Sequence, residues 1–325
     1  MQKYYTKPRS IILFDESIRS RYTKNNYNSH LNQFIRFLGI TSPDKLLLIP
    51  QNDLQQLLED YLLELKQSIN PNSVPSKFQG IRHFCIMNQI NVNWTIIQKM
   101  FPQKQKMPQL RSYTSDEIAC MLNCIKNLRD KALIHFLAST GARIGIFDHK
   151  LTVKHMMNMP DSCIAVKLYA GDVEEYWSFL TPQASKALNA YHMYRRRTGE
   201  IFTEDAPVFA IKNRIPKQLG WNGTRSAIYR IVSKSNITRH KQNLRYDVQI
   251  DHGFRKRFNT ILKLDNSVNY NIAEKLMGHK NGLDGVYLTP TIDEMFKEFR
   301  KIIYKLEIPK NTGMNSQNST SRVQS

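Results

Sequence analysis

The sequence predicts a mainly α protein of two domains, an all-α N-terminal domain and an α-rich second domain that contains a small antiparallel β hairpin. Apolar residues recur at helical spacing through most of the 325 residues. One stretch, 163–181, alternates apolar and polar residues instead, as a hairpin does. Between two helical regions lies 102–112, which contains two prolines, three glutamines and three basic residues and has the composition of a linker.

The predicted all-α domain covers residues 15–101 and follows an N-terminal segment, 1–14. One set of apolar residues keeps helical spacing and stops before Gly39: Tyr27, Leu31, Phe34, Ile35 and Leu38. A second set runs from Leu54 to Leu65, and two further helical runs follow it. About four short helices with a basic surface therefore make a compact module.

The second domain is predicted over residues 113–306. Thr114 and Glu117 form a capping box that starts its first helix, and Gly141 marks a tight turn between two later helical stretches. The remaining tail, 307–325, has almost nothing to bury, so we expect it to be disordered.

Within the hairpin, one strand carries apolar residues at every second position, Ile164, Val166 and Leu168. Lys167 stands between the last two, so it points to the opposite face of the strand. This pattern predicts a half-buried strand on which Lys167 lies on the outer face.

The chain is strongly basic, with 47 Lys and Arg against 27 Asp and Glu and a formal net charge of +20. Residues 1–111 carry 15 basic and 7 acidic side chains, and 112–325 carry 32 and 20, so both parts contribute. Such an excess indicates a polyanionic partner, with nucleic acid ahead of an anionic membrane surface. Membrane-surface binding is disfavoured because the helices do not separate an apolar face from a lysine-rich one.

Two of the four cysteines, Cys120 and Cys124, stand four residues apart with no nearby Cys/His pair to complete a zinc site. We expect them to be ordinary residues of a reducing compartment. The N-terminus lacks an apolar signal core, and no apolar run approaches the roughly 20 residues that span a bilayer. These features predict an intracellular, soluble protein.

Four short segments combine residues of phosphate chemistry. Arg143 lies in "STGARIG", and His279 ends "KLMGH", eight residues before Tyr287. "DHGFRKRFNT" places His252 and Arg255 three residues apart, so they share a face of a helix. The fourth candidate is Lys167 of the hairpin. Each alone has an ordinary explanation, as a surface cation, a helix cap or a core aromatic residue.

In this order the segments resemble the tyrosine recombinase (phage integrase) family, most closely its short archaeal and Xer-like members. "TGAR", "HGFR" and "LMGH" match three family motifs, and a tyrosine follows before a C-terminal helix. The resemblance covers roughly residues 15–305. It implies a core-binding (SAM-like) all-α DNA-binding domain followed by a catalytic domain of the DNA breaking–rejoining enzyme fold.

Cleavage of a DNA phosphodiester builds negative charge on a pentacoordinate phosphorus. Two guanidiniums, Arg143 and Arg255, can hold both non-bridging oxygens and offset that charge, and the sequence shows no acidic cluster for Mg²⁺. The phenol of Tyr287 is the predicted nucleophile, although the pKa of a free tyrosine is about 10. No metal or other cofactor is expected.

The resemblance implies roles for the other residues. We expect His252 to act as general base and His279 to hydrogen-bond the scissile phosphate. Lys167, the hairpin's single lysine, is the predicted general acid for the leaving 5′-oxygen. The resemblance also implies a 3′-phosphotyrosine intermediate that preserves bond energy, so that strand exchange needs no ATP.

The sequence departs from the family pattern at three places. Ile146 occupies the position where an acidic residue commonly follows the first arginine, and Asp148 lies two residues further on. The spacing from His279 to Tyr287 is shorter than in many members. The hairpin turn, "AGDVEE", is acidic and lacks the usual Gly-Lys-Gly.

The predicted function is that of a site-specific DNA recombinase or integrase that cleaves and rejoins DNA without metal or ATP. Its partners would be double-stranded DNA and other copies of itself, as a tetramer on paired sites. It would work in the cytoplasm, associated with the nucleoid, or in a host cell's cytoplasm if a virus encodes it. Two alternatives remain open: a relaxing enzyme resembling type IB topoisomerases, and a non-catalytic DNA-binding regulator on the same fold.

Overall fold

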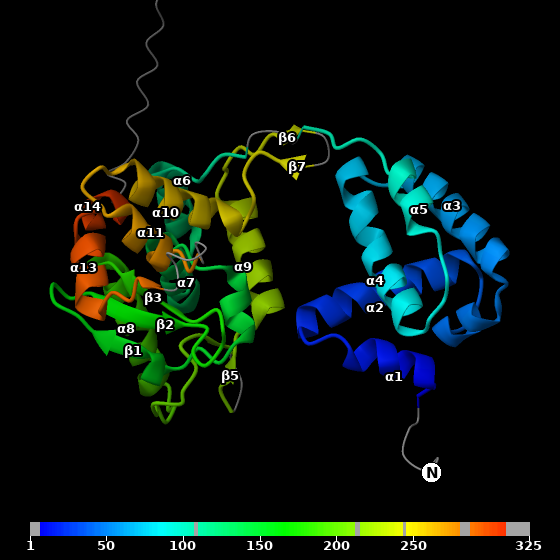
Figure 1. Ribbon diagram of the computed structural model, residues 1–325. Helices are drawn as coiled ribbons and strands as arrows, with labels where there is room; N and C mark the ends of the chain where they lie inside the picture. The colour runs from blue at the N-terminus through cyan, green and yellow to red at the C-terminus, as the bar shows by residue number, and fades with distance from the viewer. Residues whose placement is uncertain (1–6, 107–109, 212–214, 243–244, 280–286, 310–325) are drawn as a thin grey trace, which may run out of the picture. The chain divides into compact units, whose positions relative to one another are not determined.

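The computed structural model describes residues 7–106, 110–211, 215–242, 245–279 and 287–309. The chain divides into two compact units, Met1–Met107 and Pro108–Ser325, and the division falls within the stretch 102–112 (Figure 1). Each unit has a hydrophobic core of its own. Within the described residues, no helix is both long and apolar enough to cross a membrane.

The first unit is all helical where the structure describes it. Its elements are α1 (Arg9–Glu16), α2 (Arg21–Phe37), η1 (Pro43–Leu48), α3 (Gln51–Ser68), η2 (Pro71–Ser73), α4 (Val74–Met87) and α5 (Trp94–Met100). Helices α2 and α4 cross closely because Gly80 has no side chain. A Cβ there would lie 2.3 Å from the carbonyl oxygen of Tyr27.

Helix α1 begins inside the segment 1–14, which was predicted to precede the helices. Phe14 explains the difference, because its side chain is fully buried and packs on Phe84 of α4, with 5.8 Å between ring centroids. A helix of eight residues is too short for a clear periodic signal, so its packing could not be read from the sequence.

The second unit is built mainly of helices. They are α6 (Ser115–Cys124), α7 (Leu128–Thr140), η3 (Ile144–Asp148), η4 (Val153–His155), α8 (Pro182–Arg197), α9 (Trp221–Lys234), α10 (His252–Leu264), α11 (Tyr270–Leu276), α13 (Ile292–Arg300) and α14 (Ile303–Leu306). The predicted capping box is present at the start of α6, with Thr114 and Glu117 bonded to each other's backbone. Helix α7 ends at Gly141, which has φ +57°.

The predicted hairpin is confirmed as the antiparallel pair β2 (Ile164–Leu168) and β3 (Tyr176–Leu180). A short edge strand, β1 (Met156–Asn158), extends it to three strands in the order β1-β2-β3. Two minor antiparallel pairs were not predicted, because strands of two residues have no periodicity. They are β4 (Ala210–Ile211) with β5 (Lys217–Gln218), and β6 (Lys241–Gln242) with β7 (Arg245–Tyr246).

The expectation of a half-buried hairpin was wrong. Ile164, Val166 and Leu168 face one core cluster, but Ala165 and Phe179 on the other face belong to a second cluster and are also fully buried. Phe179 lies against aromatic rings of α13. The alternation of apolar and polar residues along a strand does not show what covers its second face. The packing of the C-terminal helices on that face could therefore not be predicted.

The C-terminal helices cover that second face with an apolar stripe. Met295, Phe296, Phe299 and Ile302 are buried in the same unit. Ordered packing also continues past Leu306, where the tail was predicted to begin. Ile308 is buried, and its backbone N–H and C=O both bond to the side chain of Gln183. Residues 310–325 of the predicted tail lie outside the described residues.

Replacing Gly141 with alanine should destabilise the second unit. The left-handed backbone costs a non-glycine residue about 1–2 kcal/mol, and the added Cβ would lie 2.6 Å from Phe258 atoms. Such overpacking costs roughly 1–3 kcal/mol more. Gly199→Ala is the matched control, because Gly199 has φ +92° and nothing within 4 Å of its virtual Cβ. Thermal unfolding should show a clearly larger loss for Gly141→Ala. Equal losses would mean that the Phe258 contact does not matter.

Candidate active site

Arg255 lies at the centre of the candidate site. It sits in the first turn of α10 and is only 8% exposed. Its Nη1 donates to the carbonyl of Gly141 at 3.0 Å, and its Nη2 donates to the carbonyl of Met277 at 2.6 Å. Nη2 also lies 2.9 Å from Nε2 of His279. One guanidinium thereby joins the end of α7, the end of α11 and the predicted histidine.

The contacts of His279 fix its tautomer. Because a guanidinium can only donate, Nε2 must accept from Arg255, and the ring proton must reside on Nδ1. Nδ1 lies 3.0 Å from Oε2 of Glu274, and this oxygen accepts a hydrogen bond from the Nδ1–H group. Glu274 is itself buried and ion-paired with Lys263. Burial lowers the pKa of His279, and the Glu274 carboxylate opposes part of that shift.

Arg143 reaches the same corner from the other side. It precedes η3, and its Nη1 and Nη2 both donate to the carbonyl of Gly278 at 3.3 Å. Gly278 has φ +61°, and a Cβ there would lie 2.5 Å from the ring of Tyr176. Glycine is therefore needed to bring this carbonyl to Arg143. The Nη1 of Arg143 is also 3.9 Å from a carboxylate oxygen of Glu174.

Two buried tyrosines line the pair of arginines. Burial raises the pKa of Tyr169 to about 12, although Arg143 and Arg255 act in the opposite direction. Burial likewise raises the pKa of Tyr176, against the same two guanidiniums. Both phenols therefore stay protonated at neutral pH and do not neutralise the arginines.

Lys167 lies on β2 with its side chain 33% exposed. Its Nζ is 3.2 Å from Oε1 of Glu175 and 5.1 Å from the ring centroid of Trp177, its partner across the sheet. The Gly171 N–H and then Lys167 itself lower the pKa of Glu175 against the effect of burial. The acidic turn of the hairpin thus supplies the lysine's counter-ion.

The remaining two predicted residues are exposed. His252 is the first residue of α10, one turn before Arg255, and Tyr287 is 80% exposed. Tyr287 directly follows 280–286, which lies outside the described residues. Among the described contacts, the structure brings together Arg143, Arg255 and His279. It does not place His252, Lys167 or Tyr287 in contact with these three.

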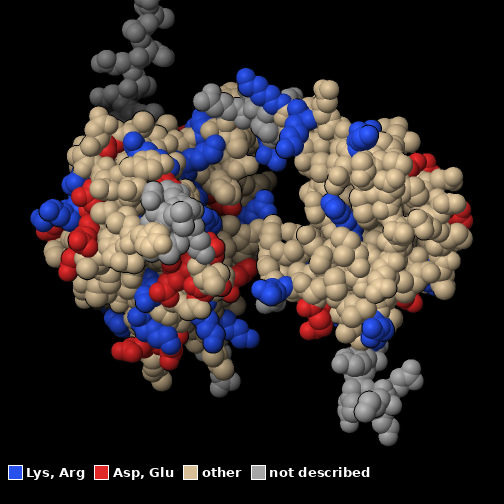
Figure 2. Space-filling view, in the orientation of Figure 1, with Lys and Arg blue, Asp and Glu red and all other residues tan. Residues whose placement is uncertain are grey.

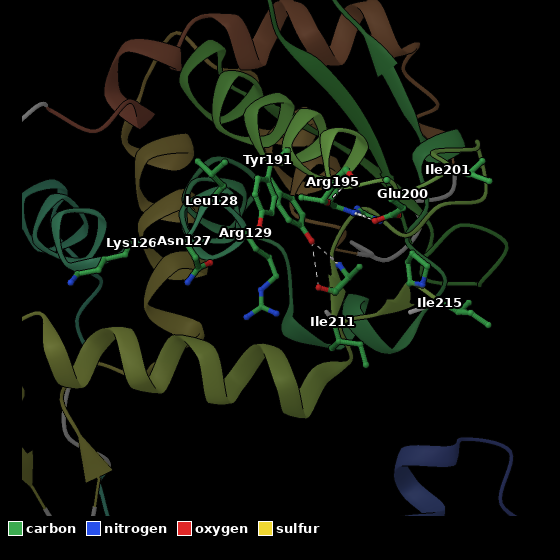
Figure 3. A pocket seen from close by; sticks show the side chains of 15 residues that line it. Lys126, Asn127, Leu128, Arg129, Tyr191, Arg195, Glu200, Ile201, Ile211 and Ile215 are labelled. Atoms are coloured by element: carbon green, nitrogen blue, oxygen red, sulfur yellow. Dashed lines mark hydrogen bonds and ion pairs between the residues drawn. The ribbon is translucent and has the colours of Figure 1, made fainter. Parts of the chain in front are cut away.

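A hollow of about 1050 Å³ lies elsewhere on the second unit and contains none of the six predicted residues. Figure 3 shows side chains from the start of α7, the C-terminal half of α8 and the β4–β5 pair around it. Arg129 and Arg195 lie among apolar residues such as Ile211. Arg195 is already paired with Glu200, so the hollow holds no arrangement for phosphate chemistry comparable with the arginine pair.

Within the described residues, no three His, Cys, Asp or Glu side chains are grouped to hold a metal ion.

The family model of the phage integrase family matches residues 111–283, more than half of the chain. The chain belongs to the phage integrase family. The protein is therefore a tyrosine-type site-specific recombinase. No curated protein matches its sequence.

Several solved recombinase structures share the fold. Lambda integrase bound to DNA is 14% identical with a TM-score of 0.55, over 90% of this chain and 95% of that one. XerH bound to a palindromic difH substrate is 14% identical with a TM-score of 0.56, over 80% and 74%. The Tn1549 transposon integrase with transposon end DNA is 16% identical with a TM-score of 0.51, over 90% and 98%. The predicted fold class is confirmed.

The recombinase lacks the usual acid near Arg143 for a structural reason. Ile146 is fully buried in the main core, so this position serves packing. Asp148 does not replace the acid, because its Oδ1 accepts from the backbone N–H of Trp221 at 2.9 Å and caps α9. Glu274 and Gly278 also belong to the site and were not predicted as site residues. Glu274 lies five residues before His279, a spacing that carries no recognised motif, whereas Gly278 stood within "LMGH".

The titration of His279 tests its contact with Glu274. In the DNA-free recombinase, NMR should give His279 a pKa below the ordinary value of about 6.5. Glu274→Gln should lower it further, because the neutral amide no longer favours the imidazolium. Glu294→Gln is the control, since that exposed carboxylate caps α13. An unchanged His279 pKa in Glu274→Gln would show that the Nδ1 contact is absent in solution.

Proposed function

We propose that this recombinase cleaves and rejoins DNA at defined sites through a 3′-phosphotyrosine on Tyr287. The observation that carries the proposal is the convergence of Arg143 and Arg255 on the turn that leads into His279. Their hydrogen-bond acceptors at this turn are neutral and leave both positive charges in place, and the exposed carboxylate of Glu174 lies 3.9 Å from Nη1 of Arg143. A bound phosphodiester would offset them, and the additional charge of its transition state would be stabilised most.

In the proposed reaction the phenolate oxygen of Tyr287 attacks the phosphorus, and the bond to the 5′-oxygen breaks. His252 takes the phenol's proton, since its exposed position at the start of α10 leaves its ring nitrogens accessible. Lys167 gives a proton to the departing 5′-oxygen. Rejoining reverses these steps, so the phosphotyrosine conserves bond energy and no ATP is needed. The two guanidiniums supply the charge that a metal ion would otherwise supply.

His279 has to change its hydrogen bonding to serve this reaction. In the DNA-free state Nε2 accepts from Arg255 and cannot donate to a phosphate. We propose that phosphate binding draws a proton onto Nε2, because the phosphate's negative charge favours the imidazolium. The buried carboxylate of Glu274 then stabilises that imidazolium through Nδ1.

Lys167 must likewise exchange its partner. Its ion pair with Glu175 has both side chains about one-third exposed, so the pair contributes little stability. The lysine can therefore leave Glu175 at modest cost when DNA covers the hairpin.

We propose that the recombinase assembles as a tetramer on paired DNA sites, because exchange between two duplexes requires four cleavages. A solved structure shows a lambda integrase tetramer bound to a Holliday junction, with 13% identity and a TM-score of 0.52. The stripe of α13 is buried in its own unit. The contacts between copies must therefore use other surfaces. The place of action is then wherever such DNA lies, in the cytoplasm or on the nucleoid.

The two alternatives are weaker. A relaxing enzyme would need one duplex only, so a requirement for paired sites separates it from the recombinase. A regulator that only binds DNA would have no use for two guanidiniums and a histidine gathered at one point.

Tyr287→Phe should abolish covalent DNA adducts while leaving DNA binding intact, because the ring stays and the nucleophilic oxygen is lost. Trapping on a suicide substrate followed by denaturing electrophoresis measures the adduct. Tyr304→Phe is the matched control, since Tyr304 is also exposed and close in sequence. Adducts formed by Tyr287→Phe, or their loss in Tyr304→Phe, would refute the assignment.

Lys167→Ala should cleave ordinary DNA slowly and regain most of its rate on DNA with a 5′-bridging sulfur. A thiolate leaves without a proton, whereas an alkoxide needs one. Arg143→Ala should show no such rescue, because its proposed task is to stabilise charge on the phosphoryl oxygens. Single-turnover rates on both substrates decide the role. A wild-type rate for Lys167→Ala on ordinary DNA, or slow cleavage of both substrates, would exclude it as the general acid.

A further inference from the structure

The positive charge of the second unit is concentrated in one continuous segment. Residues 206–246 contain nine Lys and Arg and no Asp or Glu. The stretch 112–325 carries 32 basic and 20 acidic side chains, so this segment of 41 residues accounts for nine of its twelve excess positive charges. It runs through α9 and the β6–β7 pair to the residue before Asp247.

Several cations outside this segment have acidic partners. Lys154 pairs with Asp205 at 2.7 Å, Arg300 pairs with Asp161 at 2.7 Å, and others pair in the same way. In the described part of 206–246, by contrast, no Lys or Arg forms an ion pair. The described cations of this segment are therefore not neutralised by the protein's own carboxylates.

Two acids at the base of the β6–β7 hairpin, Asp247 and Glu117, are occupied by Arg111. Its Nε donates to Oδ2 of Asp247 at 2.9 Å, and its Nη1 and Nη2 donate to the two oxygens of Glu117 at 2.9 and 2.8 Å. The other oxygen of Asp247 accepts from the backbone N–H of His240 and of Val248. These acids hold the base of the hairpin in place. They are not available to neutralise its outer cations.

A second contact stiffens the hairpin. The guanidinium of Arg239 lies 4.0 Å from the ring centroid of Tyr246 and donates twice to the carbonyl of Val248, at 3.0 and 2.8 Å. Lys241 and Arg245 lie on the two strands beyond this contact and are exposed. Figure 2 shows Lys and Arg side chains gathered where Figure 1 places β6 and β7.

The hairpin is also tied closely to the candidate site. Tyr246 precedes His252 by six residues, which span at most about 20 Å. At about 3.4 Å per nucleotide along one strand, this reach corresponds to roughly six phosphates. A duplex held at the arginine pair would therefore carry phosphates within reach of the hairpin.

We propose that the β6–β7 hairpin is a sequence-independent phosphate-binding arm, in which Lys241 and Arg245 contact the DNA backbone beside the cleaved bond. The inference rests on the proposed function only in taking DNA as the partner. Uncompensated cations release counter-ions when they meet phosphates, so their contribution falls as salt rises. A rigid base keeps the entropy lost on binding small.

The test compares two double variants of the full chain that each remove two positive charges. Lys241→Gln with Arg245→Gln should reduce the slope of log affinity against log salt by about 0.9 per contact, or about 1.8 in all. The ratio of wild-type to variant affinity should then shrink about tenfold between about 50 and about 200 mM salt. Fluorescence anisotropy with a short labelled duplex of arbitrary sequence measures both quantities.

Lys154→Gln with Arg300→Gln is the matched control, since those cations already have acidic partners, and its slope should stay near that of the wild type. Lys241→Arg with Arg245→Lys keeps the charges and should also keep the slope. Circular dichroism should show each variant folded. An unchanged slope for the hairpin double, or an equal loss in the control double, would overturn the proposal.

Covalent trapping separates this inference from the proposed function. The hairpin double should still form the Tyr287 adduct at saturating DNA, because it keeps Arg143, Arg255 and Tyr287. If the wild type forms adducts and the hairpin double keeps the wild-type slope, the arm is refuted and the chemistry stands. If the wild type forms no adduct but the slope falls as expected, the proposed chemistry fails and the arm stands.

Discussion

The site depends on one buried charge, the guanidinium of Arg255. Burying an ion costs several kcal/mol unless its donors are satisfied, and burial lowers the pKa of this group. Gly141 and Met277 supply the acceptors, and each is the C-cap of a helix, where backbone carbonyls lack helical partners. Two helix ends thus converge because one cation needs their carbonyls.

The choice of carbonyls over carboxylates keeps the site positive. A carbonyl carries only a partial charge, so it holds Arg255 in place without neutralising it, whereas Arg143 also has the Glu174 carboxylate 3.9 Å from its Nη1. The β6–β7 hairpin shows the same separation of tasks on the surface. There, Arg111 forms ion pairs with Asp247 and Glu117, so these two carboxylates do not neutralise the outer cations. A protein that binds a polyanion benefits when its carboxylates hold structural cations in place and do not neutralise the cations that face the partner.

The sequence was sufficient for residues that follow a motif and insufficient for those that act through packing. Arg143, Arg255 and His279 were predicted and do come together, because their motifs lie at helix ends that the fold brings to one corner, after α7, at the start of α10 and after α11. Glu274 was missed, since its partner is defined by the turn after α11 rather than by a helical repeat. The buried second face of the hairpin was missed for a similar reason, because its cover comes from helices far along the chain, from α10 to α14.

In the DNA-free site, the contact between Arg255 and His279 occupies the N–H group and the ring nitrogen that would otherwise face a phosphate. Nη2 of Arg255 divides its donors between Met277 and the imidazole. In the proposed mechanism a phosphate oxygen would take the place of the imidazole nitrogen on this guanidinium. His279 would then be free to turn its Nε2 toward the same phosphate, now as a donor. Glu274 remains bonded to Nδ1 in both states, so the ring keeps its anchor while its other nitrogen changes from acceptor to donor. The substrate itself would thereby complete the site, because its charge favours the protonated histidine that binds it.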